Sequence, residues 1–538
     1  MRIVDKSILV YNTVKYLRPV QLMNQVAVRI RPKELFWKYR KKDIEYTEYN
    51  LWISGLDDNF SYVKRFKADG ILKDQLTLLN ETRSLGKWRY DDAAHLWQFN
   101  LHYLEYLIPM ISAWKENGDD RYIENAGQIL EDWYQNGSME PDSNHAYTVS
   151  LRVVNQLIIA PFVKEKRKLY DSIYAQYRFL INHQEKHLMG NHYFENLKAI
   201  VICSVVFGEE DIYKRYIAGL FKELEEEISP DGLHFELSTM YHKIVLEDLI
   251  RVATVLQQAG KEEHKRVAGY IQKMCSALYS LEDGISRTLL FNDAGDNVAK
   301  PTDSLLSVCE RMFNIYPSKS SLVSGYSILS DGKIRVVEDC GALSPSYMPG
   351  HAHCDCLSFE LFYNGQPVFV NSGTFQYQGP YRQYFRSTKA HNTVVINGHE
   401  QSELWGEHRA GRRIRVLKNE QSERDVTGEY KNYYGERHKR YLRLMNSTLF
   451  ISDTVSGSAE SYFHFAPGFK VSGNKILGNG LEIRVDSGNI VSRVEQTLYS
   501  DEFGKTEPNE CLVFEWENDG KERTLSFEIC EAVDSPAK

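Results

Sequence analysis

Apolar residues in the first half of the chain recur at steps of three and four positions. Residues 123–133 and 267–281 show the pattern most clearly. This spacing is typical of helices that bury one face. Short clusters of Gly, Asp and Asn separate the apolar runs, so we expect antiparallel helical hairpins packed in a ring or a bundle.

The pattern changes near residue 320. Short runs rich in β-branched and aromatic residues follow, separated by Asp-Gly or Asn-Gly pairs at 331–332, 364–365, 397–398 and 479–480. Such pairs are the strongest local signal for a β-hairpin. We therefore predict an α+β multidomain chain with the helix-to-strand boundary at 315–325. Its expected parts are an N-terminal extension at 1–60, a helical domain at 61–320 and an antiparallel strand domain at 321–538.

The composition is that of an ordinary globular protein. Of 538 residues, 42% are hydrophobic and 26% charged, which excludes disordered, collagen-like and coiled-coil proteins. The formal net charge of −8 argues against a nucleic-acid partner. Aromatic residues make up 12% of the chain, and they suit either a helical core or the wall of a sugar-binding cleft. Glycine-rich phosphate loops are absent from the sequence, so no nucleotide or organic cofactor is expected.

The N-terminal 30 residues contain basic side chains but no uninterrupted apolar run, and no bilayer-spanning segment follows. The eight cysteines are scattered. We therefore expect a cytoplasmic protein with reduced thiols. Export by another route would leave the same sequence trace. The sequence leaves the oligomeric state open.

Five segments gather polar side chains among aromatic residues. They lie at 96–106, 147–155, 190–196, 231–242 and 350–391. A lone histidine beside aromatic residues is more often a hydrogen-bonded core residue, and a lone arginine can simply pair with an acid. The functional interpretation places several of these side chains in one substrate-binding cleft: Asn100, His102, Arg152, Asn155, Glu195, Glu236 and Arg386.

The last of these segments also suggests a metal. His351 and His353 share a face if the backbone there is extended, and His391 supplies a third imidazole. Three imidazoles are plausible ligands for a transition metal. Cys354 and Cys356 are alternative soft ligands, although on an extended strand they point away from the histidines.

Five motifs, taken together and in order, resemble the heparinase II/III-like polysaccharide lyases, a group that includes oligoalginate lyases. They are Asn191-His-Tyr-Phe-Glu-Asn, Glu236-Leu-Ser-Thr-Met-Tyr-His, His351-Ala-His-Cys-Asp, Val370-Asn-Ser-Gly-Thr and Tyr384-Phe-Arg-Ser-Thr-Lys-Ala-His-Asn-Thr-Val. The similarity runs from about residue 90 to 400. It implies an N-terminal (α/α) toroid, a C-terminal antiparallel β-sandwich, and a cleft between them.

The resemblance also implies a reaction. These enzymes cleave uronic-acid polysaccharides by β-elimination, in which a base removes the proton α to the carboxylate and an acid assists the 4-O leaving group. Hydrogen-bond donors must first neutralise the carboxylate. The family's catalytic positions fall on Asn191, His192, Tyr241 and His351, with Glu195 placed to orient His192. The division of acid and base roles between Tyr241, His192 and His351 stays open.

In metal-binding members of the family a structural zinc sits on His, Asp and His. The two histidines match His353 and His391, and the aspartate position falls on Asn371. An amide oxygen lacks the charge of a carboxylate, so the metal is bound more weakly, completed by another group such as Asp355, or missing.

Three functions are consistent with the sequence. The first is a lyase acting on an acidic polysaccharide or oligosaccharide. A glycoside hydrolase on the same scaffold would need two carboxylates flanking the bond, and Glu195 with Glu236 is the best pair. The third is a non-catalytic glycan-binding or assembly protein of a surface-polysaccharide pathway. An anionic substrate also requires basic residues in the cleft, for which we expect Arg152, Arg382 and Arg386.

Overall fold

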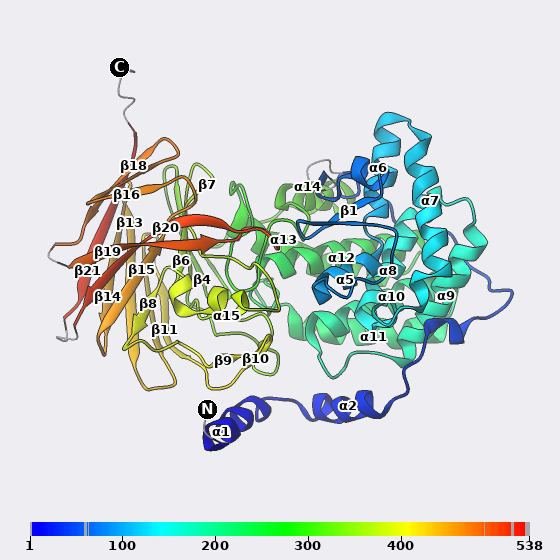
Figure 1. Ribbon diagram of the computed structural model, residues 1–538, viewed down its shortest axis with the longest axis horizontal. Coiled ribbons are helices and arrows are strands. Elements are labelled where there is room, and N and C mark those ends of the chain that lie inside the picture. Colours follow the sequence, from blue (N-terminus) through cyan, green and yellow to red (C-terminus); the bar gives the residue numbers. More distant parts are fainter. Residues whose placement is uncertain (1–2, 59–61, 63, 489, 518–520, 533–538) are drawn as a thin grey trace.

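The computed structural model describes residues 3–58, 62, 64–488, 490–517 and 521–532. Helices fill one half of the molecule and β-sheets fill the other (Figure 1). The change falls between Phe313, where the last long helix ends, and Leu322, where the first strand of the sheets begins. The predicted order of helices first and strands second is therefore confirmed.

The helical half packs as consecutive pairs. α6 contacts α7, α8 contacts α9, α10 contacts α11 and α12 contacts α13, while α6, α8, α10 and α12 also contact one another in sequence. This second set forms an inner layer, in which α10 is buried along almost its whole length. The bounds are α4 Ala68–Ile71, α5 His95–Tyr103, α6 Leu107–Asn117, α7 Asp120–Gln135, α8 Ala146–Ile159, α9 Lys166–Asn182, α10 Gly190–Val206, α11 Glu210–Glu227, α12 Thr239–Gln258, α13 Glu263–Glu282 and α14 Thr302–Phe313.

Three antiparallel sheets make up most of the other half. Their strand orders are β3-β4-β5-β6-β7, β11-β12-β13-β14-β21-β18-β17-β16 and β19-β20-β15-β8. The bounds are β3 Leu322–Val323, β4 Tyr326–Asp331, β5 Ile334–Asp339, β6 Phe359–Tyr363, β7 Gln366–Phe369, β8 Val394–Ile396, β11 Arg415–Gln421, β12 Asp425–Lys431, β13 Arg437–Met445, β14 Thr448–Val455, β15 Ala459–His464, β16 Lys470–Ser472, β17 Lys475–Gly478, β18 Leu481–Asp486, β19 Val491–Tyr499, β20 Glu507–Trp516 and β21 Arg523–Glu531.

The three sheets share one apolar core. Phe369 of β7 lies near its centre, with its ring 4.8 Å from Phe465 and 5.1 Å from Phe527 between centroids. Aromatic rings at this separation interact favourably beyond their burial.

The Asn-Gly turns explain the registers of two hairpins. Asn364 and Gly365 both have positive φ and join β6 to β7, and Asn479 and Gly480 do the same between β17 and β18. Asparagine and glycine tolerate this left-handed conformation, which a two-residue hairpin turn requires. The hairpins predicted at these pairs are confirmed.

An N-terminal arm, residues 3–42, runs along the lower edge of Figure 1 and carries α1 Ile3–Val14 and α2 Pro19–Ile30. α1 contacts β10 (Arg409–Ala410), and Trp405 Nε1 of β9 (Leu404–Trp405) donates to Thr13 Oγ1 at 3.0 Å. Gln21 Nε2 of α2 donates to the carbonyls of Leu188 and Tyr347 at 3.3 Å. The N-terminal arm therefore contacts both halves of the molecule.

Within the described ranges, no helix combines the length and apolar character needed to cross a lipid bilayer.

Candidate active site

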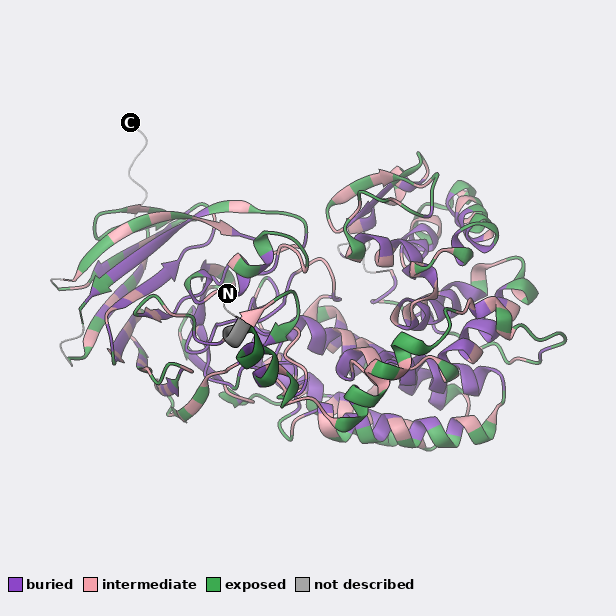
Figure 2. Ribbon diagram, turned by 60° about the horizontal axis from the view of Figure 1, so that its bottom comes forward, coloured by how far each residue is buried: buried purple, intermediate pink, exposed green. Residues whose placement is uncertain are grey.

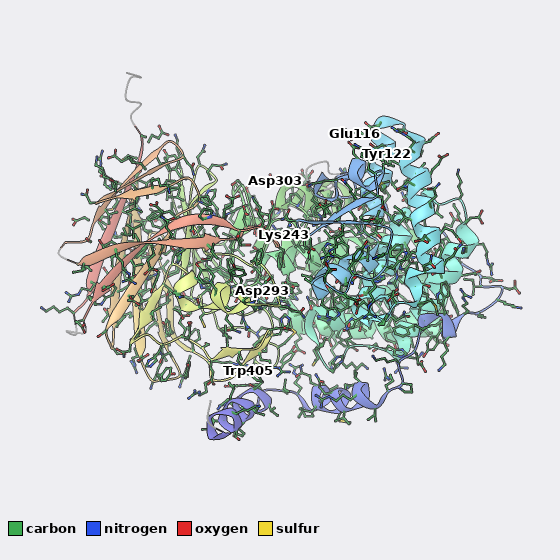
Figure 3. The ribbon with its side chains drawn as sticks, viewed as in Figure 1. Glu116, Tyr122, Lys243, Asp293, Asp303 and Trp405 are labelled. Atoms are coloured by element: carbon green, nitrogen blue, oxygen red, sulfur yellow. The ribbon has the colours of Figure 1, made fainter. Side chains whose placement is uncertain are left out.

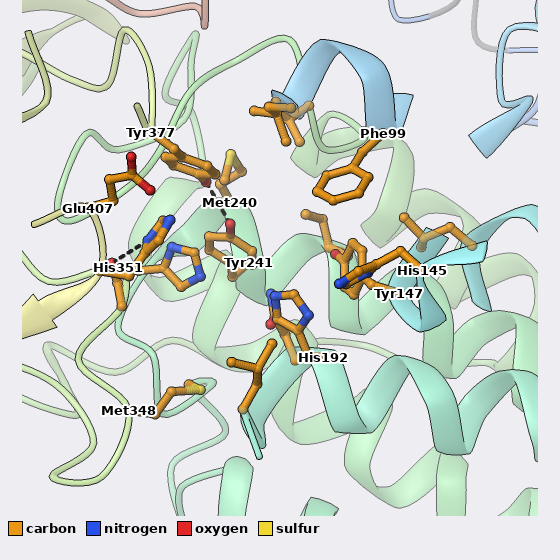
Figure 4. A pocket seen from close by; sticks show the side chains of 18 of the residues that line it. Phe99, His145, Tyr147, His192, Met240, Tyr241, Met348, His351, Tyr377 and Glu407 are labelled. Atoms are coloured by element: carbon orange, nitrogen blue, oxygen red, sulfur yellow. Dashed lines mark hydrogen bonds between the residues drawn. The ribbon is translucent and has the colours of Figure 1, made fainter. Parts of the chain in front are cut away.

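A cavity of about 1350 Å³ lies where the helices, the sheet half and the N-terminal arm meet. Its walls come from α5, α8, α10 and α12 on one side and from the loops at 346–351, 377–378 and 405–409 on the other. Figure 4 shows the aromatic and imidazole side chains that project into it. Six residues predicted for the site line this cavity: Asn100, Asn155, Asn191, His192, Tyr241 and His351.

Tyr241 and His351 face each other across the two halves (Figure 4). Their ring centroids are 4.1 Å apart, and the Tyr241 hydroxyl shares a 2.6 Å hydrogen bond with the hydroxyl of Tyr377. Ser238 positions the tyrosine because its Oγ caps α12 by accepting from the Tyr241 N–H at 3.4 Å. Burial raises the pKa of Tyr241 well above its ordinary value, and Tyr377 adds to the effect. The phenol is therefore held protonated and can act as a proton donor.

Asp293 orients His351. Its Oδ2 lies 2.9 Å from His351 Nδ1, and Arg382 binds both oxygens of the same carboxylate. Figure 3 shows Asp293 at the junction between the helices and the sheets. Burial alone would raise the pKa of Asp293. Arg382, His351 and His353, which all bind this carboxylate, outweigh burial and hold the pKa of Asp293 well below its ordinary value. A carboxylate only accepts, so a neutral His351 carries its proton on Nδ1 and presents the lone pair of Nε2.

His192 pairs with Glu185. Its Nδ1 lies 3.2 Å from Glu185 Oε1, and His145 Nε2 approaches the same oxygen at 3.6 Å. Burial would lower the pKa of His192, but Glu185, together with Glu236 and Glu195, more than compensates, and the net pKa is raised above the ordinary 6.5. The two histidines also lower the pKa of the Glu185 carboxyl to about 2, against the effect of its burial. The pair therefore favours a positively charged imidazole at the cavity wall.

Asn191 and His192 sit in the first turn of α10, which begins at Gly190 with φ of +54°. A Cβ at Gly190 would overlap the thioether end of the Met348 side chain, and the positive φ of this residue is a conformation that glycine adopts without strain. The side-chain Oδ1 of Asn191 is buried without a hydrogen-bond partner. A buried acceptor without a partner at the cavity wall is available to a donor group of a ligand.

Glu195 does not orient His192, contrary to expectation. Its carboxylate instead forms a buried cluster with Lys198 and Asp248, with Lys198 Nζ 2.5 Å from an oxygen of each. Glu236 is also buried; its Oε1 accepts from the Asn191 N–H at 3.2 Å, and its Oε2 lies 3.6 Å from His351 Nε2. Neither carboxylate lines the cavity, so this pair does not flank a bond bound there, as the glycoside hydrolase alternative requires.

Three other residues predicted to bind substrate also lie outside the cavity lining. Arg152 is fully buried and donates to Gln176 Oε1 and to the carbonyls of His102 and Ser143, while burial lowers its pKa to about 9. Burial also lowers the pKa of His102 to about 3. Arg386 donates to the carbonyls of Ala352, Gly406 and Glu407. Arg152 and Arg386 hold backbone segments together, because buried donors take the nearest carbonyl acceptors.

Basic groups nevertheless gather at the cavity. Among the described residues that line it, seven are Lys or Arg and four are Asp or Glu. Some of these cations are already paired, as Arg65 is with Glu105. Arg409 is exposed and lies over the Trp405 ring at 4.8 Å. The excess of positive charge therefore comes from other residues than the expected Arg152, Arg382 and Arg386.

A second cluster lies directly behind His351. His353, Asp355 and His391 are buried, and their potential ligand atoms lie within 4.8 Å of one another. His353 Nε2 is 2.9 Å from Asp293 Oδ1 and His391 Nδ1 is 2.8 Å from the Ser387 carbonyl, so these outer nitrogens carry the protons. The two inner nitrogens then face each other with lone pairs only 3.2 Å apart.

This donor set fits a cation. Burial lowers the pKa of His353 to about 4 and that of His391 to about 3, so both rings are neutral near pH 7. Neutral imidazoles and a carboxylate are the ligands that zinc prefers. Asp355 is the acid that lies within reach of both histidines, whereas the Oδ1 of Asn371, the predicted ligand, accepts from Ser358 Oγ and the Asn392 N–H.

Sequence reasoning missed Glu185, Asp293 and Tyr377 as parts of this arrangement. Asp293 follows the apolar run Thr288–Phe291 within an Asn-Asp-Ala-Gly-Asp stretch, a signal for a polar group at the end of a buried segment. Glu185 and Tyr377 lie in irregular segments outside the helices and strands. No local pattern marks them.

The chain matches the sequence models of two domains. Residues 33–323 match the heparinase II/III N-terminus, and residues 316–528 match the heparinase II/III-like C-terminal domain. Two curated relatives are heparin-sulfate lyases. That of Bacteroides thetaiotaomicron is 21% identical over 74% of this chain and 64% of its own length. That of Pedobacter heparinus is 20% identical over 58% of this chain and 53% of its own length. The chain thus spans less than two thirds of either relative.

Solved structures show the same fold. A crystal structure of heparinase III superposes with a TM-score of 0.71 at 17% identity, covering 93% of this chain and 89% of that one. A heparan sulfate lyase from Pedobacter heparinus superposes with a TM-score of 0.59 at 17% identity, covering 96% and 89%. Since the two domain models together cover most of the sequence, the chain belongs to the heparinase II/III-like family.

Proposed function

We propose that the protein is a polysaccharide lyase that cleaves a uronic-acid-containing glycosaminoglycan or a related acidic oligosaccharide by β-elimination. The observation that carries the proposal is the contact between Tyr241 and His351, whose ring centroids are 4.1 Å apart, in a cavity that Asn191 and His192 also line. A protonated phenol, an oriented imidazole and a cationic imidazole are the groups that this reaction needs. The heparin-sulfate lyase relatives support the same substrate class.

The carboxylate of the substrate would bind at Asn191 and His192. The raised pKa of His192 supplies a positive charge. The Nδ2 group of Asn191 would donate the hydrogen bond, because an amide oxygen and a carboxylate both only accept. Withdrawing charge from the carboxylate acidifies the proton at the neighbouring C5 carbon, because the electron pair left there can delocalise into the neutralised group.

Proton transfer would then involve His351 and Tyr241. His351 accepts the C5 proton at Nε2, which lies 3.6 Å from Glu236, beyond normal hydrogen-bond distance. The electron pair of the C–H bond forms the C4–C5 double bond as the C4–O bond breaks. Tyr241 donates its proton to the departing oxygen, and Tyr377 is placed to share the charge that develops on the phenol.

We also propose that the helical hairpins form an (α/α) toroid and that the sheets pack as a β-sandwich. The inner layer of α6, α8, α10 and α12 and the shared core of the three sheets support this architecture. His353, Asp355 and His391 would hold a structural zinc ion, which would fix the loop that carries His351 and take no part in the reaction.

The experiment is a screen of glycosaminoglycans and polyuronates for a product that absorbs in the near ultraviolet, as a 4,5-unsaturated uronate does. Tyr241→Phe should abolish turnover while substrate binding changes by no more than a few fold. Tyr316→Phe is the matched control, since that tyrosine is 61% exposed and does not line the cavity.

New reducing ends without ultraviolet absorbance would indicate hydrolysis and contradict the proposal. Binding of a polyuronate without turnover across the whole panel would instead indicate a glycan-binding protein.

A further inference from the structure

The N-terminal arm turns apolar side chains outward. Ten of the 19 large hydrophobic residues that are exposed in the described part of the chain lie between residues 8 and 30. Four of them, Val10, Val14, Leu22 and Val26, line the cavity. The other six do not: Ile8, Tyr11, Val20, Met23, Val28 and Ile30.

The α2 helix is the clearest case, because polar side chains attach it to the rest of the protein while apolar side chains are exposed on its outer side. Gln21 is 3% exposed and donates to two backbone carbonyls of the body, and Arg18, just before the helix, pairs with Glu226 of α11. Met23 and Ile30, in contrast, are 73% and 78% exposed. Val20, Met23, Ala27 and Ile30 follow one another at helical spacing and form one outward stripe. A helix anchored by its polar face leaves its apolar face for another surface.

The arm is also strongly basic. Residues 1–42 contain eleven Lys or Arg and two Asp or Glu, whereas the rest of the chain contains 54 and 71. Exposed cations lie next to the apolar stripe, among them Arg31 and Lys33 just after α2. Figure 2 shows α1 and α2 crossing the front of the molecule with mostly exposed surface.

We propose that the outer face of the N-terminal arm binds the surface of an anionic lipid bilayer. Its helices would lie in the plane of the headgroups, with Tyr11, Met23 and Ile30 inserted and the basic residues paired with lipid phosphates. Outward apolar side chains flanked by cations are the features of an interfacial helix. A second copy of this chain would carry the same positive arm, so the charge disfavours pairing between two arms.

This orientation would place the cavity next to the bilayer, because the inner side of the same arm forms one of its walls. Val10, Val14, Leu22 and Val26 give that wall an aliphatic character. An enzyme held in this way would meet glycans that are attached at or near a membrane.

The test is co-sedimentation of the full chain with vesicles of phosphatidylcholine alone and with vesicles that also contain phosphatidylglycerol. We expect binding to the anionic vesicles, weakening as salt is raised. The double variant Met23→Gln, Ile30→Gln should reduce the bound fraction by about tenfold or more. Its matched control is Met139→Gln, Leu477→Gln, which changes two exposed apolar residues outside the arm and should bind as the parent does.

Circular dichroism should show all variants folded, and light scattering reports self-association. Binding equally to neutral and anionic vesicles, or not at all, would overturn the proposal. So would a parent chain that is a dimer and a double variant that is a monomer, since the arm would then bind a second copy. The assay needs no turnover, so its failure is separate from any failure of the proposed lyase activity.

Discussion

Asp293 contacts His351 and His353 with different oxygens of one carboxylate, at 2.9 Å in each case. The first histidine lines the cavity and the second belongs to the cation-binding cluster. Arg382 neutralises the same carboxylate from the sheet half. The residue therefore joins the helical half, the cavity and the cluster behind it, and its substitution should affect all three.

We predict that Asp293→Asn lowers kcat by about a hundredfold or more, because an amide no longer fixes the tautomer of His351. The change should also cost about 3–5 kcal/mol of stability, since Arg382 loses its buried partner. Steady-state kinetics and thermal unfolding measure the two effects. Asp303→Asn, on the exposed first turn of α14, is the control. Unchanged kcat in the folded variant would mean that Asp293 does not orient the base.

The pH dependence of kcat/KM should reflect the His192–Glu185 pair. The cationic imidazole is needed to bind the substrate carboxylate, so activity should fall as pH rises through the raised pKa of His192. Glu185→Gln removes the main group that raises this pKa, and the falling limb should move to lower pH. A limb that stays in place in the variant would assign it to another group.

The same pair makes stability depend on pH. The His192 contribution is complete below its unfolded pKa of 6.5 and is lost as pH rises through the higher folded value. The Glu185 contribution is complete above its unfolded pKa of 4.5 and is lost as pH falls towards about 2. Chemical unfolding should therefore show the largest difference between the parent and Glu185→Gln between these two unfolded pKa values.

A chelator should lower Tm by several degrees, because a cation bound only to the folded state stabilises that state. His391→Ala should abolish zinc binding and remove the effect of the chelator. Asn371→Ala should leave bound zinc close to the parent level, since Asn371 Oδ1 already accepts from Ser358 Oγ and the Asn392 N–H. Elemental analysis measures the metal. Equal zinc content in the parent and His391→Ala would contradict this assignment.

Arg409→Gln should raise KM for an acidic oligosaccharide about threefold to tenfold with little change in kcat, because an exposed cation at the cavity contributes to attraction and not to proton transfer. The variant should also show a weaker dependence of KM on salt. Arg215→Gln, an exposed arginine of α11 that likewise lies over a neighbouring ring, is the control. A proportional loss in kcat would place Arg409 in the reaction itself.

The parts of the structure that depend on local spacing could be predicted from sequence. The hairpin at Asn364-Gly365 forms because both residues tolerate positive φ. The helices α7 and α13 follow from apolar residues at steps of three and four positions. Sequence motifs also predicted four residues of the site that do line the same cavity: Asn191, His192, Tyr241 and His351.

Partners fixed only by tertiary packing could not be predicted. Glu195 lies one helical turn from His192 and is the natural local partner, yet Glu185, in the loop before α10, makes the contact. Arg152 has the chemistry of a substrate-binding residue, but the fold buries it among carbonyls that need a donor. Nothing in the sequence around either residue distinguishes these outcomes.

The carboxylate of Asp293 couples the cavity to the cation-binding cluster. A ligand that binds or protonates His351 changes the electrostatic environment of the Asp293 carboxylate. Asp293 also accepts a hydrogen bond from His353, and the strength of that bond sets how well the other ring nitrogen of His353 can donate its lone pair to a cation. Binding at the two places is then thermodynamically linked, and linkage is reciprocal. If zinc binds at the cluster, substrate should change the affinity for the metal by the same factor by which the metal changes the affinity for substrate.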